Sequence, residues 1–273
     1  MWLLDLGNTR LKLARVGGDP RGRARDGAGP GEVIALAHDD ADFDRSLRAL
    51  LAEAARPLAA KGARDGSPPD DRADEAWLAS VAPVGVRLRV ESALDAAGLR
   101  VRHAKTQAEC AGVRIAYADP ARLGVDRFLG LLAARARGGD QLVVSFGSAV
   151  TVDLLDAGGR HHGGLIGIAA SHARQALGER FPALDRGAGD ARVAFAADTP
   201  DAVAAATHRQ ALGLVLAAWD DACAALGRPP AVLLGGGDAL AYADTLARRL
   251  RAAVAVSDAL VLDGLRRYAD AMG

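Results

Sequence analysis

The sequence has few cysteines, few aromatic residues and no excess of charge, and each shortage excludes a class of protein. Only Cys110 and Cys223 are present. They lack the paired spacing of a zinc site or a disulfide framework, so a reducing, cytoplasmic location is expected. The 34 basic residues balance 34 acidic ones, which gives no basic surface for nucleic acid or an anionic membrane. No apolar run reaches the roughly 18 residues of a transmembrane helix, and no signal peptide is expected at the N-terminus.

What the sequence does contain is an ordinary globular composition. Half of its 273 residues are hydrophobic and a quarter are charged, which suits two domains or one large domain. The spacing of apolar residues predicts an α/β protein. Strands are predicted at 2–6, 10–16, 33–38, 77–81, 99–103, 141–145, 150–155, 231–234 and 253–256, and a strand or loop at 163–166. Helices are predicted at 43–61, 84–97, 122–137, 171–177, 239–252 and 258–271, with one or two more in 200–226. The polar segments 17–32 and 62–74 are predicted to be surface loops.

Each half of the chain contains two predicted strands joined by a turn that carries glycine and a small polar residue. In the first half this segment is Leu-Asp-Leu-Gly-Asn-Thr at 4–9, and in the second it is Val-Ser-Phe-Gly-Ser-Ala at 144–149. The correspondence predicts an internal duplication of the fold.

Residues 5–12, Asp-Leu-Gly-Asn-Thr-Arg-Leu-Lys, form the first candidate site. Gly7 lets backbone N–H groups approach an anion, and Asn8 and Thr9 add side-chain donors. Asp5 would repel a bare phosphate, so it implies Mg²⁺ between the two, directly or through water. Lys12 would neutralise further phosphate charge. A plain hairpin with Asn-Thr in its turn is the alternative interpretation.

The second candidate is Gly124-Val125-Asp126-Arg127, at the start of a predicted helix. Asp126 either complements the helix dipole or accepts a hydroxyl proton during phosphoryl transfer. In the second case Arg127 would bind a carboxylate or a phosphate.

Three further segments carry weaker signals. The turn at 145–151 would form a second phosphate hairpin facing the first. The glycines 235–237 follow an apolar strand, so they would either admit adenine or ribose, or make a strand-to-helix turn. They do not fit a dinucleotide fingerprint, and the sequence has no P-loop motif. His161 and His162 suit a turn better than a metal site, because adjacent strand side chains point to opposite faces and no third ligand is near.

Taken together, these segments resemble the type III pantothenate kinases, within the acetate and sugar kinase, heat-shock chaperone and actin superfamily. The resemblance covers nearly the whole chain and keeps the order of the motifs. Besides 5–12 and 124–127, the matching segments are Ser80–Pro83, Tyr117, Gly163–Ile166, Asp198–Ala202, Gly235–Asp238 and Leu260–Leu265.

The resemblance implies two duplicated ribonuclease H-like domains, 1–120 and 121–273. Each would be a mixed five-stranded sheet flanked by helices, with the nucleotide bound in the cleft between them. It also implies that ATP phosphorylates pantothenate to 4′-phosphopantothenate, the first step of coenzyme A synthesis. The family uses Mg²⁺ and a monovalent cation such as K⁺ or NH₄⁺, and it acts as a homodimer.

The resemblance also implies a role for each matching residue, with Asp126 as the general base. The implied ATP-binding residues are Asp5, Leu6, Gly7, Asn8, Thr9, Arg10, Leu11, Lys12 and Ser148. The implied pantothenate-binding residues are Tyr117, Gly124, Val125, Asp126, Arg127 and Thr199.

One departure from the family pattern concerns the monovalent cation. The family carries Asp at the position of Ser145, where it is the cation ligand, and Thr at the position of Ser148. Serine in place of aspartate removes a negative charge, and hard cations prefer charged oxygen ligands. The sequence therefore predicts weak or absent K⁺ dependence.

Two other functions remain as alternatives. One is a kinase of the same superfamily with another small hydroxyl substrate, against which Tyr117 and the motif at 124–127 favour pantothenate. The other is a non-catalytic accessory protein related to transcription. The presence of Asp5, Lys12 and Asp126 argues against that role, and zero net charge argues against direct DNA binding.

Overall fold

The computed structural model describes residues 1–16, 32–55, 75–184 and 187–273. They form two compact units. Unit 1 comprises Met1–Ala111, Ala118–Ala133 and Val261–Gly273, and unit 2 comprises Gly112–Tyr117 and Ala134–Leu260. The predicted loops 17–32 and 62–74 lie almost wholly outside the described residues, as does the end of the helix predicted at 43–61. The two units alternate along the chain, so they give no single boundary to compare with the one predicted after residue 120. That boundary stays a prediction.

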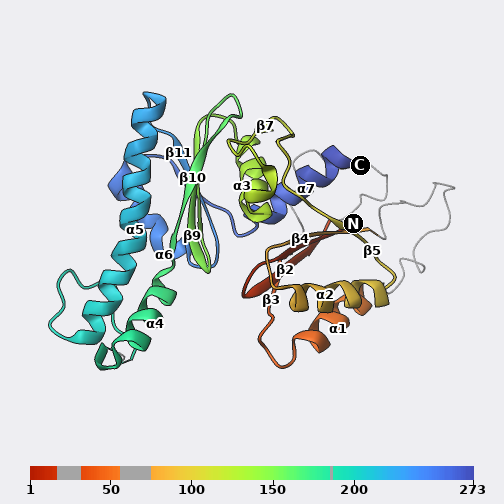
Figure 1. The fold of residues 1–273 in the computed structure, drawn as a ribbon, viewed down its shortest axis with the longest axis horizontal. Helices are drawn as coiled ribbons and strands as arrows, with labels where there is room; N and C mark the ends of the chain where they lie inside the picture. Colours follow the sequence, from red (N-terminus) through yellow and green to blue (C-terminus); the bar gives the residue numbers. More distant parts are fainter. Residues whose placement is uncertain (17–31, 56–74, 185–186) are drawn as a thin grey trace. The chain divides into compact units, whose positions relative to one another are not determined.

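Unit 1 is built on a five-stranded sheet in the order β3-β2-β1-β4-β5. Its strands are β1 (Trp2–Leu6), β2 (Arg10–Arg15), β3 (Ile34–Ala37), β4 (Glu75–Ser80) and β5 (Arg100–His103). The first three strands pair antiparallel, whereas β4 and β5 continue the sheet in parallel. Two helices, α1 (Phe43–Ala55) and α2 (Val84–Ala96), cover one face of this sheet (Figure 1).

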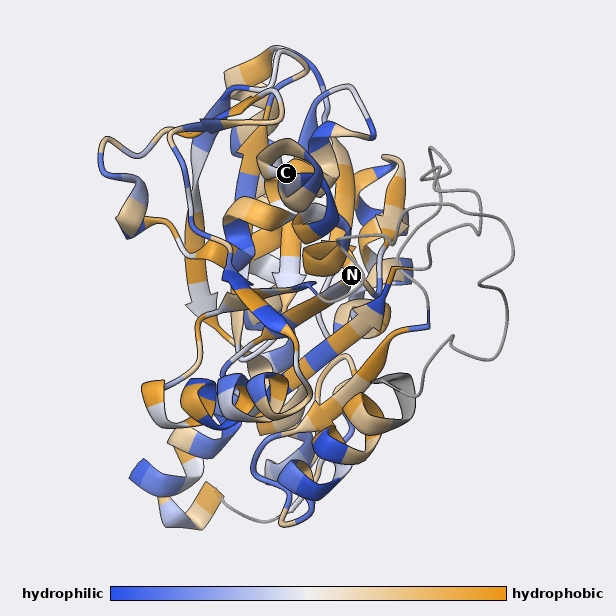
Figure 2. Cartoon of the chain, turned by 90° about the vertical axis from the view of Figure 1, so that its right-hand side faces the viewer, coloured by the Kyte–Doolittle hydropathy of each residue, from blue (hydrophilic) through white to orange (hydrophobic). Residues whose placement is uncertain are grey.

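The packing of unit 1 follows from its apolar periodicity. Phe43 and Leu47 of α1 and Leu94 of α2 are fully buried against strand residues such as Leu4 and Leu78. Figure 2 shows orange hydrophobic and blue hydrophilic segments alternating along the helices and strands. Burial of each of these large side chains contributes roughly 1.5–3 kcal/mol to folding.

Two more helices of unit 1 are α3 (Val125–Arg135) and α7 (Leu260–Met272). Tyr268 of α7 connects them to the sheet. Its ring makes edge-on contacts with Trp77 at 5.5 Å and with Phe128 at 6.2 Å between ring centroids. Its hydroxyl accepts a hydrogen bond from the Lys105 backbone N–H at 3.3 Å, so the polar end of this buried ring is satisfied.

Unit 2 repeats the same sheet, in the order β10-β9-β8-β11-β12. Its strands are β8 (Gln141–Phe146), β9 (Ala149–Leu155), β10 (His161–Ile168), β11 (Ala231–Gly235) and β12 (Val254–Val256). Again the first three strands are antiparallel and the last two parallel. The helices are α4 (Ala170–Arg180), α5 (Thr199–Leu226) and α6 (Ala239–Leu250). The α5 and α6 side chains pack on the sheet and form the core of the unit.

The matching strand orders confirm the predicted fold of two mixed five-stranded sheets flanked by helices. The predicted segment 200–226 forms one helix, α5, of 28 residues from Thr199 to Leu226. It begins after the N-cap Asp198 and ends at Gly227, which has a left-handed conformation. The sequence missed the short hairpin β6 (Glu109–Cys110) and β7 (Val113–Arg114). Its strands of two residues are too short to show a period. The structure also has short 3₁₀ helices at Pro120–Arg122 and Pro182–Leu184.

None of the helices in the described part of the chain combines the length and apolar character needed to cross a lipid bilayer.

Candidate active site

The first hairpin, between β1 and β2, matches the predicted strand-turn-strand. The Gly7 N–H donates to the Arg10 carbonyl at 3.0 Å and closes the turn, which leaves the Asn8 and Thr9 side chains exposed at its tip. Asp5 lies opposite Lys12 in the register of the two strands. Opposite charges at such cross-strand positions lie on the same face of the sheet and attract each other.

Asp5 is the most electrostatically unusual group of unit 1. The pKa of its carboxyl is raised to about 7, mainly by burial and then by the negative charge of Asp126, against the opposing positive charge of Lys12. The electrostatic influence of Asp126 shows that unit 1 brings together two acids that are 121 residues apart in sequence. Two carboxylates and a lysine near one another are characteristic of a functional site.

Asp126 lies in the first turn of α3, where the helix dipole favours a negative charge. Its Oδ1 accepts a hydrogen bond from the Arg127 backbone N–H at 2.9 Å. Gly124 provides the space for this carboxylate, since a Cβ at position 124 would lie 2.6 Å from the same oxygen. Arg127 is buried, whereas Val125 and Asp126 are half-buried. The motif therefore holds a partly accessible carboxylate in a defined orientation.

The second hairpin, between β8 and β9, differs from the first in its charge. The Gly147 N–H donates to the Ala149 carbonyl at 3.0 Å, and Ser145 pairs across the strands with Thr151. Two hydroxyls therefore stand where the first hairpin has the Asp5 carboxylate and the Lys12 ammonium. Ser148 is half-buried in the turn.

The glycines after β11 make a close backbone contact with this second hairpin. Gly236 has φ +93°, and a Cβ there would lie 2.2 Å from the Phe146 carbonyl oxygen. The Asp238 N–H donates to the same oxygen at 3.2 Å. The conformation of Gly236 is thus explained by the turn that begins α6 and by the hairpin, which favours the turn interpretation of this segment over direct contact with a nucleoside.

The remaining predicted pantothenate-binding residues, Tyr117 and Thr199, both lie in unit 2. Tyr117 is half-buried and stacks on His161, with ring centroids 6.1 Å apart and planes 5° apart. Thr199 is the first residue of α5 and lines a cavity of about 580 Å³ with residues such as Leu177 and Val203.

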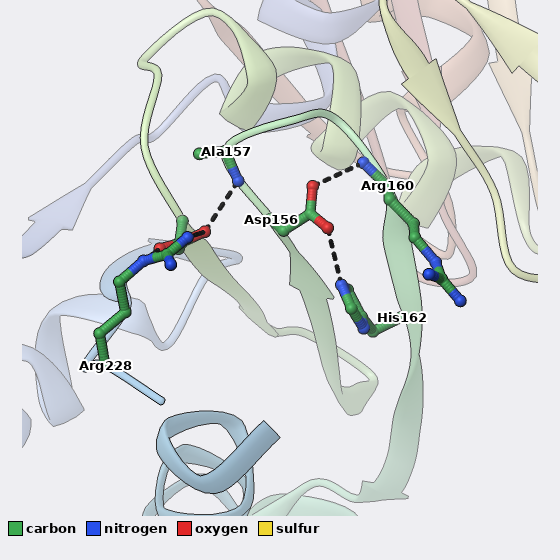
Figure 3. A network of polar contacts seen from close by, with 6 residues as sticks. Asp156, Ala157, Arg160, His162 and Arg228 are labelled. Atoms are coloured by element: carbon green, nitrogen blue, oxygen red, sulfur yellow. Dashed lines mark hydrogen bonds and ion pairs between the residues drawn. The ribbon is translucent and has the colours of Figure 1, made fainter. Parts of the chain in front are cut away.

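The prediction that His161 and His162 lie in a turn is wrong, because they are the first two residues of β10. His161 is buried, and its Nε2 lies 3.0 Å from Asp153 Oδ1. His162 lies at a β-bulge, and its Nε2 is 2.9 Å from Asp156 Oδ2 (Figure 3). The sequence missed the role of His161 because its partner Asp153 is on the neighbouring strand, where no local pattern connects the two.

The network in Figure 3 lies at the far end of β8 and β9 from the Gly147 turn. Asp140, just before β8, is buried, accepts from the Ala157 N–H at 2.8 Å, and forms an ion pair with Arg228. The hydrogen bond from Arg228 is the largest cause of the lowered pKa of Asp140. Asp156 accepts from the Arg160 N–H at 2.9 Å, which fixes the turn after β9. These contacts stabilise the end of the sheet.

Among the described residues, no group of three or more His, Cys, Asp or Glu side chains could hold a metal ion. Asp5 and Asp126 supply two carboxylates at most, and the remaining ligands of a Mg²⁺ ion there would have to be phosphate oxygens and water. That donor set fits Mg²⁺ bound together with a nucleotide rather than as a resident structural metal.

Comparison with known proteins gives a family match over most of the chain. The profile described as "Type III pantothenate kinase" matches residues 1–221. Proteins named type III pantothenate kinase from Xanthomonas campestris pv. campestris and Stenotrophomonas maltophilia are each 39% identical to the chain. Their alignments, over 271 and 270 residues, cover 98% of this chain and 96% of each relative.

Similarity to solved structures extends over nearly the whole chain. A protein from Campylobacter jejuni titled as a conserved Baf family transcriptional activator has a TM-score of 0.57 and 15% identity. A 2-dehydro-3-deoxygalactonokinase protein from Sinorhizobium meliloti has a TM-score of 0.55 and 16% identity. Each comparison covers 99% of this chain and 98% of the other. At such identities the similarity concerns the fold alone.

Proposed function

Because the chain belongs to the type III pantothenate kinase family, we propose that it transfers the γ-phosphoryl group of ATP to the terminal hydroxyl of pantothenate. The products are 4′-phosphopantothenate and ADP, and the reaction begins coenzyme A synthesis. The observation that carries the proposal is the meeting of Asp5, Lys12 and Asp126 in unit 1, within a chain similar to named kinases over nearly its full length.

Asp126 is proposed as the general base. Its carboxylate would accept the hydroxyl proton of pantothenate while the hydroxyl oxygen attacks the γ-phosphorus and the bond to the β-phosphate oxygen breaks. Two features support this role. The Arg127 N–H holds the carboxylate in one orientation, and the absence of a Cβ at Gly124 leaves room for it there. Its position in the first turn of α3 also stabilises the ionised form needed to accept a proton.

The first hairpin is proposed to hold the ATP phosphates, with Asp5, Leu6, Gly7, Asn8, Thr9, Arg10, Leu11 and Lys12 as its residues and Ser148 as a contribution from the second hairpin. Asp5 would orient Mg²⁺ directly or through water, and the ion would neutralise charge on the transferred phosphoryl group. The raised pKa of Asp5 supports this arrangement. A carboxylate that is costly to ionise in the protein alone gains from a nearby cation.

Pantothenate is proposed to bind through Tyr117, Thr199 and the segment 124–127. Arg127 is the basic residue of that segment and would pair with the substrate carboxylate. The cavity beside Thr199 is lined largely by small apolar side chains, which suits the dimethyl portion of pantothenate.

Dependence on K⁺ or NH₄⁺ is proposed to be weak. Ser145 and Thr151 give the second hairpin hydroxyl oxygens without a negative charge, which is a poor donor set for a cation.

A homodimer in the cytoplasm is proposed as the working form. Several large apolar side chains of unit 2 are exposed, among them Ile166 at 66% and Phe181 at 52%. Such residues are typical of a surface that a second protein covers.

The proposal is tested by measuring ADP release from ATP and Mg²⁺ with and without pantothenate, for the wild type and Asp126→Asn. We expect pantothenate-dependent turnover in the wild type and a loss of roughly 10²–10⁴-fold in kcat in the variant. A wild type without pantothenate-dependent turnover would reject the kinase and favour an accessory role. Equal turnover in both proteins would reject Asp126 as the base and leave the kinase standing.

A further inference from the structure

Tyr117 is held in place by contacts that the proposed reaction does not use. One face of its ring stacks on the ring of His161, nearly parallel to it. The residue before it, Ala116, directs its backbone N–H at His161 Nδ1 at 3.4 Å. His161 is itself 1% exposed, so it is a fixed part of the interior. The buried His161 side chain thus connects this tyrosine to the core of unit 2.

The hydrogen bonds of His161 define its tautomer. A backbone N–H can only donate, so Nδ1 must be the unprotonated acceptor. Nε2 then carries the proton and donates it to Asp153 Oδ1, 3.0 Å away. Asp153 is also buried, at 2% exposed. A buried carboxylate that fixes the tautomer and orientation of an imidazole is a common supporting arrangement around functional sites.

The chain leading to Tyr117 is held to the same unit. The Arg114 N–H donates to the Gly159 carbonyl at 2.9 Å, and the Arg135 side chain donates to the Gly112 carbonyl at 3.1 Å. Accordingly residues 112–117 belong to unit 2, although both flanking segments belong to unit 1. His161 contacts Ala116 and Tyr117, the last two residues of this short segment.

We infer that His161, oriented by Asp153, is a positioning residue that fixes the ring of Tyr117 for pantothenate binding. This inference rests on the proposed function for its substrate, and on the stacking and hydrogen-bond geometry for its mechanism. His161 acts through Tyr117, and its ring face and Nδ1 are occupied by Tyr117 and Ala116.

The position of the stack indicates which kinetic constant it affects. His161 pairs with Leu155, and Ala149 at the other end of β9 adjoins the second phosphate hairpin. Ala149 and Leu155 are six residue steps apart along the strand, or about 20 Å at roughly 3.3 Å per step. Tyr117 would therefore contact the part of pantothenate distant from the transferred phosphoryl group. Disturbing it should raise the KM for pantothenate and leave kcat and the KM for ATP nearly unchanged.

The first test needs no activity. The chain has three tyrosines, Tyr117, Tyr242 and Tyr268, so protein labelled with 3-fluorotyrosine gives three ¹⁹F resonances. The Tyr117 resonance is identified by its loss in Tyr117→Phe. We expect His161→Gln to shift or broaden this resonance alone, because glutamine still donates to Asp153 but offers no ring to stack. His162→Gln, on the adjacent histidine paired with Asp156, is the matched control and should change none of the three.

The second test is a double-mutant cycle on the KM for pantothenate. We expect His161→Gln to raise this KM about 10-fold in the wild-type background, as for groups in contact. In a Tyr117→Ala background the same change should have little further effect, since the residue through which it acts is gone. A merely structural histidine would affect both backgrounds equally. If His161→Gln does not fold, His161→Asn, which also offers no ring to stack, carries the same comparisons.

The outcomes separate the two proposals. A Tyr117 resonance unaffected by the His161 variants would overturn the positioning role, as would equal KM effects in both backgrounds. A wild type without pantothenate-dependent turnover would reject the proposed function, and the ¹⁹F spectra would still decide whether His161 positions Tyr117.

Discussion

Replacing Asp5 by asparagine should make the protein more stable at neutral pH while removing its proposed activity. In the folded chain the pKa of Asp5 is raised from 3.8 to about 7, mainly by burial and then by the charge of Asp126. Each pKa unit corresponds to about 1.36 kcal/mol, so keeping this carboxylate ionised disfavours folding by at most about 4 kcal/mol. Asparagine has the same shape and no charge, but it loses the attraction to Lys12. We therefore expect a net gain of about 2–4 kcal/mol at pH 8.

The gain should depend on pH in a definite direction. A raised pKa in the folded state means that the folded protein binds the Asp5 proton more readily than the unfolded chain does. The destabilisation of the wild type is therefore absent below the unfolded pKa of about 4 and grows by about 1.4 kcal/mol per pH unit. It levels off once pH exceeds the folded pKa of about 7. The difference between variant and wild type should be small near pH 4.5 and largest at pH 8.

Thermal unfolding in EDTA and without nucleotide measures this effect. For a chain of this size about 1 kcal/mol corresponds to roughly 2–4 °C, so the variant should melt about 5–15 °C higher at pH 8. Asp39→Asn, at an exposed turn of the same unit, is the control and should change the melting temperature little at either pH. With Mg²⁺ and ATP added, the difference in melting temperature should shrink or reverse, because only the wild type retains the carboxylate proposed to orient Mg²⁺. Equal melting temperatures at pH 8, or the same gain at both pH values, would refute the electrostatic reasoning.

Three other substitutions test the site and its support. Gly124→Ala would place a Cβ 2.6 Å from Asp126 Oδ1, so kcat should fall about 100-fold in the coupled ADP assay. The wild type should respond to K⁺ by less than about twofold, and Ser145→Asp should create a clear K⁺ activation by restoring a charged ligand. Gly236→Ala would force a Cβ against the Phe146 carbonyl at φ +93°, so urea unfolding should register a loss of about 2–4 kcal/mol.

The Gly236→Ala prediction has a matched control, and the other two have outcomes that would contradict them. Gly213→Ala, in α5 with open space around it, should be neutral or slightly stabilising, which separates the clash at Gly236 from the general effect of adding a methyl group. A Gly124→Ala variant with normal kcat would contradict the assigned role of that space. A wild type that is nearly inactive until K⁺ is added would contradict the inference from Ser145.

Local patterns were enough to predict most of the secondary structure. The strands and turns around Gly7 and Gly147, and the repeated order of elements in the two halves, follow from period-2 alternation and turn chemistry, which depend on neighbouring residues. The hairpin at Glu109–Arg114 was missed because its strands are too short for a period. The sequence predicts a turn for the pair His161-His162 because the bulge depends on strand pairing, and the ring partners Asp153 and Asp156 lie outside β10.

The sequence by itself determined the fold class, the duplication and the family, because these depend on the spacing of apolar residues and the order of motifs along the chain. Only the tertiary structure decided which side chains meet. It brought Asp126 near Asp5 and raised the pKa of that acid, and it stacked Tyr117 on a buried histidine. Electrostatic interaction and ring packing depend on distance in space, and residues more than a hundred positions apart acquire that distance only when the sheets and helices have formed.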